Sequence, residues 1–152
     1  CEMRALEGAK IEAQLRAVLE RMRQLRAGLY DRAPQQVVDY RERLERRLRS
    51  MLHDLGVEVD EWKVLHEVGI FAEKTDVMEE LSRLDSHFHQ VEELIEKPDA
   101  EAVGRRLDFL CQEMNREVNT VGSKVQDSDM LSVCLELKAE LERFREQVQN
   151  VE

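Results

Sequence analysis

The residue types best suited to chemistry in this 152-residue chain lie between positions 76 and 87. Asp76, Glu80, Arg83 and His87 follow one another at intervals of four, three and four residues. On an α-helix this spacing places two carboxylates, a guanidinium and an imidazole along one face. Such oxygen and nitrogen groups suit Mg²⁺ or Mn²⁺, and the imidazole can also exchange protons. An ordinary exposed helix face with ion pairs would have the same spacing.

A second polar segment runs from Arg105 to Asn119. In it Glu113 and Glu117 stand one helical turn apart, and Arg106 and Arg116 are near enough to bind phosphate or to pair with these acids. A separate polar row consists of Asp108, Gln112, Asn115 and Asn119. Amide side chains of this kind either fix the register between helices or face a substrate, and the spacing leaves both interpretations open.

The composition predicts helices as the elements that position these groups. Charged residues make up 37% of the chain and aromatic residues 5%, and there are only two prolines. This balance favours long, solvent-exposed helices over sheets, so the predicted fold class is all-α.

The charge is unevenly distributed along the chain. The net charge of −10 argues against a uniformly basic surface that coats nucleic acid. Residues 1–50, however, hold 12 Lys and Arg against 8 Asp and Glu, whereas residues 51–152 hold 11 against 25. The first 50 residues are therefore basic and the rest of the chain is acidic. A solvated helical surface is the simplest structural interpretation of this charge distribution.

The cysteines and the hydropathy pattern indicate a reducing compartment. Cys1, Cys111 and Cys134 are odd in number and form no CxxC pair, so neither a disulfide framework nor a thiolate zinc site is predicted. No run of about 18 apolar residues exists, so no membrane span is predicted. We therefore expect a cytoplasmic protein.

Apolar residues recur at threes and fours and predict an elongated bundle of about five helices in a single domain, 1–152. Pro34 predicts a break between a first helix and a second one, which Gly56 ends. The lack of proline from residue 57 to 96 predicts one very long central helix over that range, although a capping box at Asp76–Glu79 could restart it.

The remaining pattern predicts two shorter helices. Pro98 closes the long helix, a fourth helix covers about 100–119, and residues 120–123 form a turn. The final helix begins near Ser128, and its predicted buried positions include Leu131 and Leu135. Several leucines approach heptad spacing, so an antiparallel bundle or coiled-coil scaffold is the simplest structural interpretation.

Several segments resemble the C-terminal signature of the YicC family of bacterial endoribonucleases. They are Arg105–Leu110, Gln112–Glu117, Asn119–Lys124 and Arg145–Glu152. Upstream, residues 76–87 and Met3–Arg4 with Glu7–Gly8 are similar to further signatures of that family. The likeness therefore spans nearly the whole chain.

The resemblance implies a metal-dependent endoribonuclease that acts on RNA within a ring-like homo-oligomer, with a hexamer as one candidate and no membrane partner. The family begins with a separate N-terminal domain opening on a Met-Thr-Gly-Phe-Gly-Arg type of signature, which this sequence lacks. We therefore expect a C-terminal fragment, with long helical arms over 1–97 and signature helices over 98–152.

Together, the residues and the resemblance define a site hypothesis. The expected ligands of one or two Mn²⁺ or Mg²⁺ ions are Asp76, Glu80, His87, Glu113 and Glu117. The expected catalytic residues are Glu80, His87, Glu113 and Glu117. The expected RNA-binding residues are Arg4, Arg83, Arg105, Arg106, Arg116 and Lys124. The rival hypothesis is a non-catalytic helical scaffold or an RNA-binding adaptor.

Overall fold

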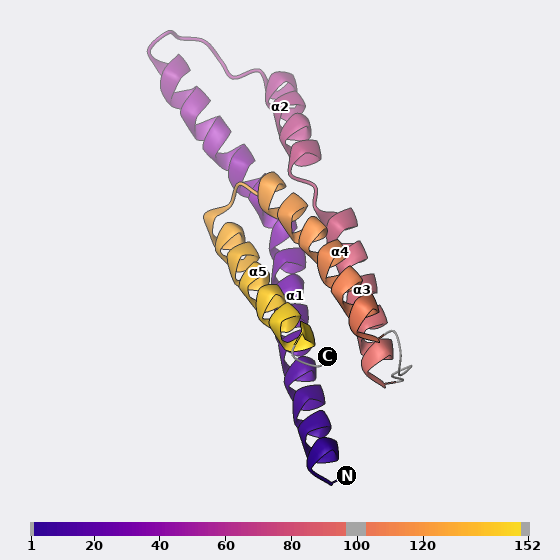
Figure 1. Cartoon of the computed structure of the whole chain (residues 1–152). Helices are drawn as coiled ribbons and strands as arrows, with labels where there is room; N and C mark the ends of the chain where they lie inside the picture. The colour runs from indigo at the N-terminus through magenta and orange to yellow at the C-terminus, as the bar shows by residue number, and fades with distance from the viewer. Residues whose placement is uncertain (1, 97–102, 150–152) are drawn as a thin grey trace.

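The computed structural model describes residues 2–96 and 103–149, with side chains from residue 8 onward, and this part of the chain is all-α as predicted. Its five helices are α1 (Glu2–His53), α2 (Glu61–Lys74), α3 (Met78–Glu96), α4 (Val103–Lys124) and α5 (Ser128–Gln149). Figure 1 shows an elongated molecule whose helices lie roughly along one direction. None of the described helices is both long enough and apolar enough to cross a bilayer.

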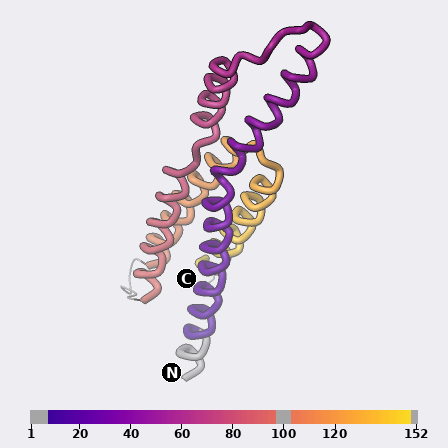
Figure 2. Tube along the Cα trace, turned by 180° about the vertical axis from the view of Figure 1, so that it is seen from behind, coloured from indigo at the N-terminus to yellow at the C-terminus, as the bar shows by residue number. Residues whose placement is uncertain are grey.

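The hydrophobic core of the described chain lies in a bundle of α1, α3, α4 and α5 (Figures 1 and 2). Each helix contributes an apolar stripe at intervals of three and four residues, and the four stripes face one another. The fully enclosed side chains, each 0% exposed, include Met22, Leu29, Leu81, Leu84, Phe88, Met114 and Phe144. We refer to this part as the bundle.

The part of α1 beyond Ala33, the connecting residues 54–60 and α2 form an arm that extends beyond the bundle (Figure 1). Within the arm, the ring of Phe71 stacks on the ring of Tyr40 with 3.9 Å between centroids, and Val64 is 1% exposed. Other large apolar side chains of the arm face solvent, with Trp62 82% and Leu55 71% exposed. Two helices alone offer one contact face each, so much of the apolar surface of the arm stays uncovered.

The prediction of a single helix over 57–96 is wrong. The helix is interrupted at Thr75, the residue that follows α2. The Thr75 hydroxyl group donates to the carbonyl oxygen of Phe71 at 2.8 Å. One carboxylate oxygen of Asp76 then accepts from the amide of Met78 at 3.0 Å, which provides the first turn of α3 with a cap. The capping pattern that the sequence offers at Asp76 was therefore the correct signal.

The longest helix is α1, with 52 residues, and Pro34 lies inside it. The predicted break at Pro34 is wrong because the packing around it outweighs the lost hydrogen bond: Leu29, Ala33 and Gln36 are all buried. Gly56 follows the end of α1 with φ of 63°, the left-handed conformation predicted for it.

The predicted turn at 120–123 is also wrong, because α4 continues to Lys124. The Thr120 and Ser123 hydroxyl groups donate to carbonyl oxygens of the preceding turn, so these residues stay within the helix. In α5 the buried stripe runs through Met130, Cys134, Leu137, Leu141, Phe144 and Val148. Leu131 and Leu135, which we expected to be buried, are 43% and 63% exposed. Pro98 lies outside the described residues.

Candidate active site on the α3–α4 face

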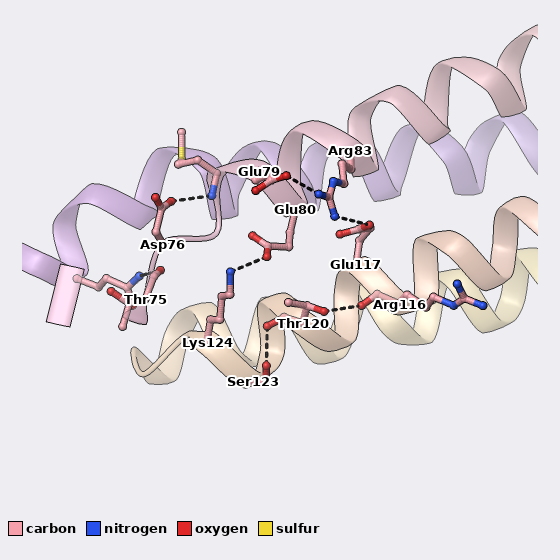
Figure 3. Close-up of polar contacts among 12 residues, drawn as sticks. Thr75, Asp76, Glu79, Glu80, Arg83, Arg116, Glu117, Thr120, Ser123 and Lys124 are labelled. Atoms are coloured by element: carbon pink, nitrogen blue, oxygen red, sulfur yellow. Dashed lines mark hydrogen bonds and ion pairs between the residues drawn. The ribbon is translucent and has the colours of Figure 1, made fainter. Parts of the chain in front are cut away.

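Charged side chains of opposite sign meet where α3 and α4 lie side by side in antiparallel orientation (Figure 3). The Lys124 ammonium group of α4 donates to Oε1 of Glu80 on α3 at 2.6 Å. Further along both helices, the Arg83 guanidinium of α3 lies 3.7 Å from a carboxylate oxygen of Glu117 on α4. We call Glu80, Arg83, Glu117 and Lys124 the charged face.

Glu80 is the acid on this face that is most removed from water. It is 8% exposed, and its Oε2 atom is buried without a hydrogen-bond partner among the described residues. A buried carboxylate is costly unless a cation compensates it, and Lys124 supplies that compensation to one oxygen only. The second oxygen is therefore available to a proton donor or to a further cation.

Arg83 connects two acids of the site. Its guanidinium group pairs with Glu79 in the preceding turn and with Glu117 across the helix interface. The charges of these two carboxylates, Glu79 first, raise the pKa of Arg83 above its ordinary value. A phosphate group could bind Arg83 in place of either acid, because guanidinium groups pair with carboxylates and phosphates in the same bidentate way.

One helical turn beyond Arg83 and Glu117 lie His87 on α3 and Glu113 on α4, in the register that the charged face sets. The Nδ1 atom of His87 is buried and has no hydrogen-bond partner among the described residues. The Glu113 carboxylate pairs with Arg116 on its own helix at 3.0 Å. An imidazole and a carboxylate thus extend the charged face by one turn.

The five predicted metal ligands do not all meet. Asp76 caps α3 through Met78 and is exposed, and no group of three or more His, Cys, Asp or Glu side chains among the described residues could hold a metal ion. A fully protein-built cage of the zinc type is thereby disfavoured. Magnesium sites often use only one or two carboxylates, together with phosphate oxygens and water, and the unpartnered Oε2 of Glu80 fits a site of this kind.

The predicted RNA-binding residues differ in how they are engaged. The Arg4 side chain lies outside the described part, Lys124 pairs with Glu80, and Arg116 pairs with Glu113. Arg105 and Arg106 instead line a groove of about 660 Å³ between α3 and α4. Neither has a carboxylate partner among the described residues.

Comparison with known proteins places this chain in a family. Residues 29–152 match the family model described as "Endoribonuclease YicC-like, C-terminal". The chain belongs to this family. It is 39% identical over 151 residues to the "Probable endoribonuclease YicC" of Clostridioides difficile (strain 630), covering 99% of this chain and 50% of the relative. It is 35% identical over 148 residues to the protein of the same name from Haemophilus influenzae (strain ATCC 51907 / DSM 11121 / KW20 / Rd), covering 97% of this chain and 43% of the relative.

The YicC-like chain thus spans about half the length of the curated relatives that it matches. The family resemblance inferred from the α3 and α4 sequence segments is confirmed. Those segments also supply the charged face, so the part of the sequence that carries the likeness is the part that brings ionisable groups together.

The polar row of α4 in this YicC-like chain faces α5. The Asn119 amide oxygen accepts from the Lys138 ammonium group at 2.9 Å, and Asp108 lies 3.5 Å from the Arg145 guanidinium. These contacts support the structural interpretation of the row, in which it fixes the register between two helices.

Of the residues that line the groove, sequence reasoning singled out Arg105 and Arg106 but not the aromatic Phe109. Phe109 is 59% exposed, although it belongs to the segment that carries the family likeness. The signal was present, because Phe109 falls outside the stripe of α4 that contains Leu107, Leu110 and Met114. An aromatic residue off the apolar stripe of a helix is not needed for the core.

Proposed function

We propose that the full-length protein is a metal-dependent endoribonuclease and that the charged face, extended by His87 and Glu113, is where it cuts RNA. The observation that carries the proposal is the buried, unpartnered Oε2 of Glu80 beside cationic Lys124 and Arg83. A site that leaves one carboxylate oxygen without a partner, with cationic side chains nearby, is suited to a reaction at a negatively charged phosphodiester.

Each side chain has a proposed role. Arg83 leaves Glu117 to hold a phosphate of the RNA, which neutralises part of the charge that develops in the reaction. Lys124 holds the Glu80 carboxylate in place through its hydrogen bond, and His87 takes or gives the proton of the attacking or leaving oxygen. Glu80 would hold the divalent ion, which when bound supplies positive charge that a phosphodiester requires during attack.

A cleavage assay tests this proposal. Full-length protein is incubated with labelled RNA and Mn²⁺ or Mg²⁺, and the products are compared for the unmodified protein, Glu80→Gln and Glu113→Gln. We expect Glu80→Gln to slow cleavage by about 100-fold or more, because it removes the charge of the proposed metal ligand and even the outer partners of a metal are worth about 10- to 100-fold. A chelator should abolish cleavage.

Glu140 offers a matched control. Glu140 pairs with Arg143 three residues later at 3.2 Å, much as Glu113 pairs with Arg116, but it lies on α5. Glu140→Gln should cut RNA normally. Unchanged cleavage by both Glu80→Gln and Glu113→Gln would reject the site. Absence of metal-dependent cleavage by the unmodified protein would favour a scaffold or an RNA-binding adaptor.

We also propose that the protein acts as a homo-oligomer joined through the arm. Met51, Leu55, Val57 and Trp62 are between 55% and 82% exposed near the far end of the arm, and exposed apolar side chains gathered in this way mark surfaces that other chains cover. Light scattering on full-length protein carrying Leu55→Ser and Trp62→Ser should report a smaller particle than the unmodified protein. An unchanged mass would contradict the proposed interface.

A further inference from the structure

The groove beyond His87 has two walls of different chemistry. Arg105, Arg106 and Phe109 come from α4, and Gln90 and Glu93 come from α3. The floor consists of apolar side chains buried in the bundle. We therefore expect an anion to bind along the α4 wall, because the α3 wall carries the acid Glu93.

Phe109 gives the α4 wall an uncovered aromatic surface. The side chain is 59% exposed and is not part of the hydrophobic core of the bundle. Single-stranded RNA is held by proteins through aromatic rings on which unpaired bases stack, combined with positive charges that follow the backbone. Phe109 with Arg105 and Arg106 provides both parts within two helical turns of α4.

Size and position also fit a nucleotide. A volume of about 660 Å³ lies within the range of small-ligand pockets. Phe109 precedes Glu113 by one turn and Glu117 by two, so the groove begins about 6 to 12 Å along the helix from the charged face. A strand that crosses the charged face can therefore reach the groove.

We propose that this groove holds an unpaired nucleotide of the RNA strand next to the cleavage site, with its base on the Phe109 ring and its phosphates on Arg105 and Arg106. The inference rests on the proposed function, because it names the substrate as single-stranded RNA and gives the direction in which the strand leaves the site.

Binding measurements in the presence of a chelator, which prevents metal-dependent cutting, test the groove separately from the chemistry. The probes are a labelled oligoadenylate of about ten nucleotides and a ribose-phosphate chain of equal length without bases. We expect Phe109→Ala in the full-length protein to weaken oligoadenylate binding about tenfold and to leave binding of the baseless chain unchanged. Phe109→Trp should restore oligoadenylate binding, and Arg105→Ala with Arg106→Ala should weaken both probes.

Tyr30→Ala is the matched control, since it removes an exposed aromatic side chain from α1, outside both the groove and the proposed oligomer interface. It should alter binding of neither probe. The inference is overturned if the unmodified protein does not bind oligoadenylate, if Phe109→Ala binds it normally, or if Phe109→Ala weakens both probes equally. A change in particle mass on Phe109→Ala would instead make the groove a protein interface and would also overturn it.

The outcome is separable from that of the cleavage assay. If Phe109→Ala binds oligoadenylate normally and Glu80→Gln loses cleavage, the groove proposal is rejected and the nuclease proposal stands. If Phe109→Ala loses oligoadenylate binding but the unmodified protein shows no metal-dependent cutting, the groove proposal stands and the nuclease proposal is rejected.

Discussion

The bundle and the arm are built from the same kind of amphipathic helix, yet they bury their apolar side chains to very different extents. In the bundle, helices on several sides enclose Phe88 and Phe144 completely. In the arm, two helices enclose Phe71 and Val64 but leave Trp62 and Leu55 exposed. Two helices have one contact face each, whereas the four helices of the bundle enclose an interior, so the arm leaves apolar surface uncovered where the bundle buries it.

The two regions also have different proposed functions. A rigid bundle can hold Glu80, Arg83 and Glu117 in fixed geometry, which a phosphodiester reaction demands. The uncovered arm is suited to association with further chains. The same α1 helix passes through both regions and connects them.

The largest predicted contrast is between two core phenylalanines. Phe88→Ala, at a site that is 0% exposed, should lower the free energy of unfolding by about 3–5 kcal/mol, because it removes a ring from a closed core. Phe71→Ala should loosen the arm alone, where the ring stacks on Tyr40. Amide hydrogen exchange checks this: Phe71→Ala should speed exchange in α2 and leave α3–α5 protected. Faster exchange throughout the bundle would contradict the division into two regions.

A smaller effect is expected at the junction of the two regions. The buried Gln36 side chain donates from Nε2 to the carbonyl oxygen of Thr75 at 3.1 Å, where α2 gives way to α3. Gln36→Leu leaves that carbonyl oxygen unpaired and should cost about 1–3 kcal/mol in urea unfolding. Its neighbour Gln35 bonds only to Asp39 on the surface, so Gln35→Leu should cost far less. Equal costs would mean that the junction contact contributes little.

The pH dependence of one inter-helix pair should be weaker still. The hydrogen bond from Arg32 of α1 lowers the pKa of Asp127, which precedes α5 and caps its first turn. The stabilisation is therefore present above the unfolded pKa and is lost as pH falls through the lower folded value. Asp127→Asn keeps an acceptor for the Met130 amide but removes the charge. Its Tm should be lower than that of the unmodified protein at pH 7 and equal to it near pH 2; a constant difference would exclude this pair as the cause.

The smallest predicted signal is in thiol labelling. Burial raises the pKa of Cys111 to about 12 and that of Cys134 to about 11. Both thiols lie in the bundle, so iodoacetamide at pH 8 should label neither of them in a Cys1→Ser variant until denaturant is added. Phe71→Ala should not accelerate labelling, since it loosens only the arm. Rapid labelling of that variant would show that the bundle opens with the arm.

Much of the fold could be predicted because helical spacing is a local property. The all-α class and the left-handed Gly56 followed from it directly. Helix boundaries did not, because they depend on tertiary packing. Pro34 stays within α1 since its neighbours are buried, and Thr75 ends α2 where its hydroxyl group and carbonyl oxygen find partners.

The residues of the charged face could be singled out from the sequence, but their pairings could not. The sequence singled out Glu80, Arg83 and Glu117, which lie at one interface. It assigned Lys124 to RNA, whereas the structure pairs it with Glu80, because a long-range contact between two helices leaves no trace in spacing. The cap formed by Asp76, in contrast, spans only two residues, and the sequence pattern at Asp76 indicated it.

The most direct test of the account is an exchange of charges across the buried pair, Glu80→Lys together with Lys124→Glu, in the full-length protein. Glu80→Lys alone should be strongly destabilised, because it places two ammonium groups together in a buried position. The exchange should restore the unfolding free energy, since the two charges still attract. The account predicts that metal-dependent RNA cleavage nevertheless stays at least about 100-fold below normal, because the carboxylate has moved from α3 to α4. Cleavage restored along with stability would show that Glu80 and Lys124 only hold the helices together, and that the reaction site lies elsewhere.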